Sequence, residues 1–169
     1  RQMCIRDRIE KDPDYTFATA RLLLHTIFKE IIGREVMPVD RATAYADYFP
    51  AFIKKGVENE LLDEKLLQYD LPRLGAALKA ERDNQFDYLG LQTLYDRYFL
   101  HVRKNRIELP QAFFMRVSMG LALNEIDREA RAIEFYEVLS SFDFMSSTPT
   151  LFNSGTLRSQ LSSCYPVSY

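Results

Sequence analysis

Apolar residues recur at steps of three and four along most of this sequence, a spacing that places them on one face of an α-helix. The first such stretch predicts a helix over residues 12–33. Asp12 suits the N-cap, Pro13 suits the first helical position, where its missing N–H costs nothing, and Gly33 suits the C-terminal end. The residues expected on the buried face of this helix are Phe17, Ala20, Leu24, Ile27, Phe28 and Ile31.

Similar patterns predict a mainly α chain, with further helices over residues 40–48, 71–78, 88–98 and 110–122, and another from residue 127. Asp40 and Asp127 suit N-caps, Pro110 suits a helix start, and Pro50 is expected to break or kink the second helix. The charged residues 80–85 predict a loop. Residues 99–102 and 107–109 predict a short hairpin with Asn105 in its turn. Inward-facing residues expected in the last two helices are Phe113, Phe114, Val117, Leu121, Ala122, Ala130, Ile133 and Val138.

The composition changes at Ser146, where the chain becomes rich in hydroxyl groups and short of charge. Pro149 and Gly155 predict a loop and a turn, and residues 156–164 are expected to form an extended strand. A hydroxyl-rich loop of this kind has two interpretations. Its Ser and Thr side chains can simply cap and turn the chain, or they can bind an anionic ligand together with backbone N–H groups.

The overall composition excludes several classes of protein. A net charge of −2 argues against a strongly basic nucleic-acid-binding protein. No apolar run approaches the roughly 20 residues that span a bilayer, and the first residues lack the apolar segment of a secretory signal. The two cysteines, Cys4 and Cys164, lie near opposite ends of the chain, so a reducing, cytoplasmic compartment in which a cysteine stays free is expected. The glycine motifs of dinucleotide-binding, P-loop and α/β-hydrolase proteins do not occur in the sequence.

The sequence predicts no metal site, because His25 and His101 lack partners at metal-binding spacing. The carboxylates of Asp63, Glu64, Glu134 and Glu137 are expected on solvated faces. Cys164 is, on general grounds, more often a buried apolar residue than a catalyst. A redox role for it requires a second thiol, and Cys4 lies in a flanking stretch that predicts disorder.

The run STPTLFNSGTLRSQLSSC, residues 147–164, resembles the first active-site segment of the large (alpha) subunit of class I ribonucleotide reductase. Residues 91–100, the Glu-Leu-Pro-Gln stretch at 108–111 and the helix after it resemble the helical domain of the same family. Asp-Pro-Asp-Tyr at 12–15 and Ala-Arg-Leu at 20–22 resemble the helix that closes its nucleotide-binding ATP-cone.

The resemblance implies a division of the chain into four parts. Residues 1–8 are unmatched, and are expected to be foreign or disordered. Residues 9–35 correspond to the last helix of a truncated ATP-cone, and residues 36–145 to the helical domain. Residues 146–169 correspond to the start of the catalytic barrel, with the first strand of a ten-stranded α/β barrel. The family's other active-site cysteines, glutamate and asparagine have no counterpart here, so a fragment that is inactive alone is expected.

The resemblance also implies roles for four residues. Thr148 corresponds to a threonine that contacts the substrate's diphosphate, and Ser163 to a serine that binds substrate. Cys164 corresponds to one of two thiols that reduce the ribose 2′ position and finish as a disulfide. Lys29 corresponds to a lysine that helps bind a regulatory nucleotide, with an ordinary solvent-facing lysine as the alternative.

The family activity is the reduction of ribonucleoside diphosphates to deoxyribonucleoside diphosphates. The expected partners are a small subunit whose dinuclear metal centre supplies a radical, thioredoxin or glutaredoxin as reductant, and a second copy of the full-length large subunit. ATP and dATP are the expected effectors, and no covalently bound cofactor is expected. Two alternatives stay open: an adenosylcobalamin-dependent or anaerobic relative, and a non-enzymatic helical interaction domain.

Overall fold

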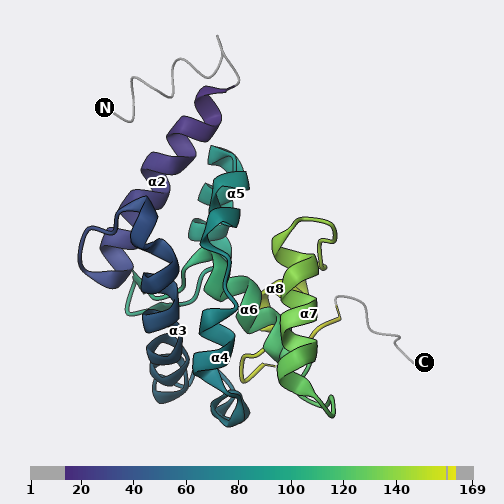
Figure 1. The fold of residues 1–169 in the computed structure, drawn as a ribbon. Coiled ribbons are helices and arrows are strands. Elements are labelled where there is room, and N and C mark those ends of the chain that lie inside the picture. Colours follow the sequence, from purple (N-terminus) through teal and green to yellow (C-terminus); the bar gives the residue numbers. More distant parts are fainter. Residues whose placement is uncertain (1–13, 159, 163–169) are drawn as a thin grey trace.

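A computed structural model describes residues 14–158 and 160–162 of the chain, and its described part is built almost entirely of helices (Figure 1). The elements, in chain order, are α2 (Tyr15–Ile32), η1 (Pro38–Asp40), α3 (Arg41–Glu58), η2 (Glu64–Gln68), α4 (Leu71–Ala76), η3 (Ala80–Gln85), α5 (Tyr88–Thr93), η4 (Leu94–Tyr98), β1 (His101–Val102), β2 (Asn105–Arg106), α6 (Pro110–Leu121), α7 (Arg128–Ser140) and α8 (Thr148–Asn153). The prediction of a mainly α chain is confirmed. None of the described helices is both long and apolar enough to cross a membrane.

The first helix, α2, ends where the sequence predicts. Gly33 adopts φ +81°, and its amide donates to the carbonyl of Lys29 at 3.0 Å, which closes the helix. Leu24 and Phe28 lie in the core as expected. Phe17, in contrast, is 40% exposed, because it lies at the rim of a cavity described below. The expected cap at Asp12 and the expected first turn at Pro13 lie outside the described residues.

The second helix does not end at Tyr48 and is not broken at Pro50, because α3 continues through the proline to Glu58. A proline inside a helix removes one hydrogen bond, here the one to the carbonyl of Ala46. Burial of Phe49 and Phe52 on either side of the proline offsets that loss. The neighbouring helix α4 approaches the helix closely at this point, and a Cβ on its Gly75 would lie 3.1 Å from the Ala46 oxygen.

Two short segments differ from their predictions. Residues 80–85 form the 3-10 helix η3 instead of a loop, and its Asp83 is buried and bonded inside the protein. The hairpin is shorter than expected, because β1 pairs with β2 through His101 and Arg106, so residues 107–109 are not its return strand. Arg103 and Lys104, at φ +48° and +76°, make the two-residue turn in place of Asn105.

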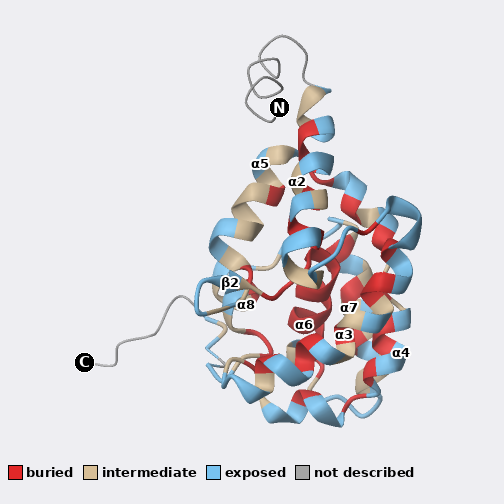
Figure 2. Ribbon diagram, turned by 90° about the vertical axis from the view of Figure 1, so that its left-hand side faces the viewer, coloured by how far each residue is buried: buried red, intermediate tan, exposed pale blue. Residues whose placement is uncertain are grey.

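Helix α6 forms the centre of the molecule, and Figure 2 shows it as a mostly buried helix. Every residue from 110 to 119 is buried. It begins at Pro110 as predicted and packs against α7, α3 and α8. Helix α7 begins after Asp127, whose carboxylate accepts from the amide of Ala130 at 3.4 Å, again as predicted.

Two of the residues predicted to face inward from these helices are exposed. Val138 of α7 is 42% exposed and Leu121 is 36% exposed. Helix α7 packs through Ala132, Tyr136 and Leu139. Because a helix turns by about 100° per residue, this set places Val138 on the opposite face. Leu121 is the last residue of α6, and the next residue, Ala122, is buried as predicted.

The segment after Ser146 is more helical than its sequence predicts. Residues 148–153 form α8, with Pro149 in the first turn, where a proline is tolerated. Gly155 turns the chain at φ +78°, as expected. Among the described residues of 156–164 there is one isolated bridge, between Leu62 and Thr156, in place of the predicted strand. Ser163 and Cys164 lie outside the described residues.

Candidate functional site

A cavity of about 660 Å³ opens beside the start of α8. Its walls come from α2, η3, α5, η4, α6, α8 and the segment that connects α7 to α8. The residues that line it are Phe17, Gln85, Phe86, Asp87, Leu89, Gly90, Thr93, Leu94, Tyr98, Phe113, Phe114, Phe142, Met145, Ser146, Thr148 and Leu151. Six aromatic rings stand in this lining, so the walls are mainly apolar, with a few hydroxyl groups at the rim.

Thr148, the predicted diphosphate-binding residue, is exposed and lies at this cavity. Its hydroxyl is 3.4 Å from the hydroxyl of Tyr98. Tyr98 stacks on Phe152 of α8, with the ring centroids 4.5 Å apart. Ser147 and Thr150 place two more hydroxyl groups 3.1 Å from each other on the same turn. The start of α8 therefore presents a group of hydroxyls beside an aromatic wall.

A buried charge cluster holds the other end of α8. The Arg116 side chain is fully buried, and its Nε donates to the Glu108 carboxylate at 2.7 Å. Its Nη1 donates to the carbonyl of Ser154 at 2.7 Å, and its Nη2 to the carbonyl of Leu151 at 3.2 Å. The amide of Leu100 donates to the second carboxylate oxygen of Glu108 at 3.0 Å. We call this set of groups the Arg116 cluster; within it, both charges have a partner of opposite sign and several hydrogen bonds.

The backbone after α8 also touches α6 directly. The hydroxyl of Ser154 donates to the carbonyl of Val117 at 2.7 Å. At Gly120 a Cβ would lie 2.1 Å from the amide nitrogen of Gly155, so only glycine fits there. The carbonyl of Gly155 in turn accepts a hydrogen bond from the amide of Asp63 at 3.1 Å. These contacts fix residues 154 and 155 between α6 and the chain that follows α3.

A second buried group, the Asp83 network, joins four elements through side chains. Tyr45 of α3 donates to Asp83 at 2.7 Å, and the side-chain amide of Gln111 donates to the other Asp83 oxygen at 2.8 Å. Tyr136 of α7 donates to the Gln111 side-chain oxygen at 2.7 Å. Burial raises the pKa of the Asp83 carboxyl to about 7, although the bonds from Gln111 and Tyr45 and the charge of Arg41 work in the opposite direction.

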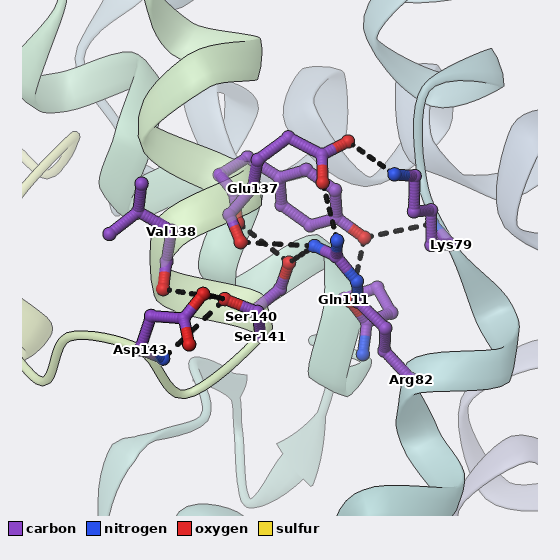
Figure 3. A network of polar contacts seen from close by, with 9 residues as sticks. Lys79, Arg82, Gln111, Glu137, Val138, Ser140, Ser141 and Asp143 are labelled. Carbon is purple, nitrogen blue, oxygen red and sulfur yellow. Dashed lines mark hydrogen bonds and ion pairs between the residues drawn. The ribbon is translucent and has the colours of Figure 1, made fainter.

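Next to this network, Lys79 and Arg82 converge on Glu137 of α7, as Figure 3 shows. Lys79 lies 2.7 Å from one carboxylate oxygen, and Arg82 bonds the other oxygen and also Ser140. Burial opposes ionisation of Glu137, but the bonds from Lys79 and Arg82 outweigh it and hold its pKa below the ordinary value. Glu137 is thus only partly solvated, as its side chain is 35% exposed, and it also binds α7 to η3.

The structure does not bring the predicted site residues together as one set. Lys29 pairs with Glu35 at 3.1 Å on an exposed face of α2. Phe17 of the same helix lines the cavity, and Lys29 lies twelve residues further on, which is about 18 Å along the helix axis. Of the three residues predicted to contact substrate, Thr148 alone is among those described. In the described part of the chain, no three His, Cys, Asp or Glu side chains are grouped so as to hold a metal ion.

Sequence reasoning missed Arg116, Glu108 and Tyr98. Arg116 interrupts the apolar face of its helix, and Glu108 precedes it by eight residues. A charged residue inside a buried face requires a partner of opposite sign, and that requirement was the available signal. No comparable signal identifies the carbonyls of Leu151 and Ser154, because any residue has a carbonyl.

Residues 84–159, which run from the end of η3 through the central helix α6 to just beyond α8, match the family described as ribonucleotide reductase, all-alpha domain. The Arg116 cluster and every residue of the cavity lining except Phe17 lie within this ribonucleotide reductase match. The relatives identify the particular subunit. The chain is 49% identical over 163 residues to the ribonucleoside-diphosphate reductase subunit alpha of Chlamydia trachomatis, a match that covers 96% of this chain and 16% of that protein.

Other relatives agree. The chain is 43% identical to the alpha subunit of the ribonucleoside-diphosphate reductase from Helicobacter pylori, over 94% of this chain and 19% of that protein. It is 36% identical to the large subunit of the same reductase from Danio rerio, over 92% of this chain and 19% of that protein. The predicted resemblance is confirmed, and the chain corresponds to one segment of the large subunit of ribonucleoside-diphosphate reductase. It spans less than a fifth of the length of these relatives.

Proposed function

We propose that this chain is part of a large subunit that reduces ribonucleoside diphosphates to deoxyribonucleoside diphosphates for DNA synthesis. One observation carries the proposal: the identity of 49% extends over 96% of the chain, which includes the hydroxyl-rich segment from Ser146. The names of the relatives specify a diphosphate substrate, which favours this function over a non-enzymatic helical domain.

In this proposal, Thr148 contacts the diphosphate of the substrate. Its exposed hydroxyl at the rim of the cavity supports that role, since hydroxyl groups bind phosphate oxygens without carrying a charge of their own. Ser163 contacts the same substrate. Cys164 is one of two thiols that give up two electrons and two protons: the 2′ oxygen leaves as water, a C–H bond replaces the C–O bond, and the thiols become a disulfide.

The other components lie outside this chain. A small subunit with a dinuclear metal centre supplies the radical, thioredoxin or glutaredoxin reduces the disulfide, and two large subunits form a dimer in the cytoplasm.

ATP and dATP act as effectors at a site to which Lys29 contributes. Arg21, His25 and Lys29 follow one another at four-residue steps on α2, which places three basic side chains on one helix face and supports an anionic effector there. Lys29 must then exchange its bond to Glu35 for the effector.

The proposal is tested in the complete large subunit, assayed with its small subunit and thioredoxin. Cys164→Ser is expected to abolish steady-state formation of deoxyribonucleoside diphosphate. Cys4→Ser is the matched control, because the proposal gives that thiol no role. Normal turnover by the Cys164 variant would refute the redox assignment.

The role of Thr148 is tested by Thr148→Val, which removes the hydroxyl and keeps the shape. The KM for the ribonucleoside diphosphate is expected to rise about tenfold, because the variant loses the binding free energy of roughly one hydrogen bond to a charged group. Thr93→Val is the control: Thr93 lines the same cavity, but its hydroxyl donates to the carbonyl of Leu89 within α5. An equal rise in KM for both variants would contradict the proposed contact between Thr148 and the diphosphate.

A further inference from the structure

Arg116 joins two segments that are distant in sequence. Its guanidinium is fully buried and bonds Glu108, which precedes it by eight residues, and two carbonyls that follow it by 35 and 38 residues. Those carbonyls, of Leu151 and Ser154, lie in the last turn of α8 and just after it. The last carbonyls of a helix have no partner inside the helix, so an external donor decides where that end of the helix lies.

The two ends of α8 are held very differently. The C-terminal end is fixed by Arg116, by the bond from Ser154 to Val117 and by the close contact of Gly155 with Gly120. At the N-terminal end, Thr148 is exposed, and its side-chain contact is the hydroxyl of Tyr98 at 3.4 Å. Because α8 has only six residues, the position of its fixed end determines where the Thr148 hydroxyl lies.

We infer that Arg116 is a positioning residue, which holds the end of α8 so that the Thr148 hydroxyl stands at the rim of the cavity. The inference rests on the proposed function, in which Thr148 contacts the substrate's diphosphate. Glu108 serves the same purpose indirectly, because its carboxylate neutralises the guanidinium and orients it toward the two carbonyls.

The first test measures hydrogen exchange in this 169-residue chain. The double variant Glu108→Gln, Arg116→Met removes both buried charges together, so that neither is left unpaired. Amides of Leu151, Ser154 and Thr156, which bond to carbonyls within or next to α8, are expected to exchange at least about tenfold faster, while amides inside α3 keep their protection. Arg116→Lys retains the charge but not the fork of donors, and provides a second variant if the double one does not fold.

Tyr45→Phe is the control, since it removes two buried hydrogen bonds, to Asp83 and from the amide of Gln111, and none of these three residues belongs to α8 or lines the cavity. It is expected to leave exchange at Leu151 and Ser154 unchanged relative to the rest of the chain. If the amides of α8 exchange at the wild-type rate in both Arg116 variants, the inference is wrong.

The second test measures kinetics in the complete large subunit. The double variant is expected to raise the KM for the ribonucleoside diphosphate about tenfold or more, with kcat changed less than KM, because a displaced Thr148 weakens substrate binding. Tyr45→Phe is expected to leave KM unchanged. An unchanged KM in an active double variant would overturn the inference. A wild-type subunit without reductase activity would instead refute the proposed function, and the exchange experiment would still decide the role of Arg116.

Discussion

The Arg116 cluster and the Asp83 network both lie against α6, but they accommodate a buried carboxyl group in different ways. Glu108 faces a guanidinium at 2.7 Å, so charge compensates charge. Asp83 receives hydrogen bonds from Tyr45 and Gln111, which are neutral, and no basic group in the described part of the chain lies within ion-pair distance of it. A positive charge thus compensates the buried carboxyl of Glu108, whereas Asp83 has neutral hydrogen-bond donors and burial raises its pKa to about 7.

The strongest test of this difference is to remove the positive partner of Glu108. Arg116→Met leaves a buried carboxylate without compensation, and we expect the free energy of unfolding to fall by about 3–5 kcal/mol. Urea denaturation measures this loss. Arg158→Met, at an exposed position, is the control and is expected to change the free energy by less than about 0.5 kcal/mol. A loss below about 1 kcal/mol at Arg116 would mean that the pair contributes little.

The Asp83 network is tested through pH. The pKa of Asp83 is raised from 3.8 to about 7 on folding, so between these values the folded chain binds more protons than the unfolded chain, and stability falls as pH rises. From pH 5 to pH 8 this group alone is expected to lower the free energy of unfolding by about 2–3 kcal/mol.

Subtracting the pH profile of Asp83→Asn from that of the wild type isolates this contribution, because the other groups titrate in both proteins. Denaturation at a series of pH values provides the two curves. A difference curve that is flat between pH 5 and 8 would show that Asp83 is ionised throughout, and would contradict the raised pKa of this group.

The contact between α6 and the end of α8 can be disrupted by a substitution that changes no charged residue. Gly120→Ala places a methyl group against Gly155, and overpacking of this kind is expected to cost about 1–3 kcal/mol. Thermal unfolding measures the cost. Gly33→Ala is an informative control, since no atom lies within 4 Å of its added Cβ, and its cost of about 1 kcal/mol comes from the positive φ alone. A neutral Gly120 variant would show that the segment moves away easily.

The smallest effect is expected at the exposed pair of Lys29 and Glu35, whose side chains are 59% and 63% exposed. Lys29→Ala should leave the urea midpoint within experimental error, because water and salt screen such a pair. A clear loss of stability would mean that the exposed fraction of a side chain does not predict how much a charged group contributes to stability, here or in the two buried clusters. If the proposed effector site is correct, the same variant weakens the response of the complete subunit to ATP.

Much of the helical architecture could be predicted from local signals. The start of α6 at Pro110, the cap at Asp127 and the end of α2 at Gly33 each depend on a few neighbouring residues, and the structure confirms them. The errors occur where tertiary contacts override such signals. Pro50 lies inside α3 because large aromatic side chains on both sides are buried, and no local rule contains that information.

The site was only partly predictable for the same reason. Thr148 could be named as a candidate because the sequence around it resembles a known segment; the structure places it at the cavity, and its role stays a prediction. The aromatic wall next to it combines Tyr98 with Phe152, which lie 54 positions apart, and the charge cluster depends on backbone carbonyls. Pairings over such separations leave no periodic pattern in the sequence.

The long reach of Arg116 has a consequence for the order of events during synthesis. Glu108 and Arg116 emerge from the ribosome almost together, but the carbonyls of Leu151 and Ser154 follow 35 and 38 residues later. At about 5–20 residues per second, the nascent chain spends several seconds with α6 complete and its arginine only partly bonded. During that interval water must supply the missing acceptors, so the interior around α6 closes only when α8 docks. Formation of the Arg116 cluster is therefore a late step of folding. Water leaves the interior around α6 only after the segment that carries Thr148 has been synthesised.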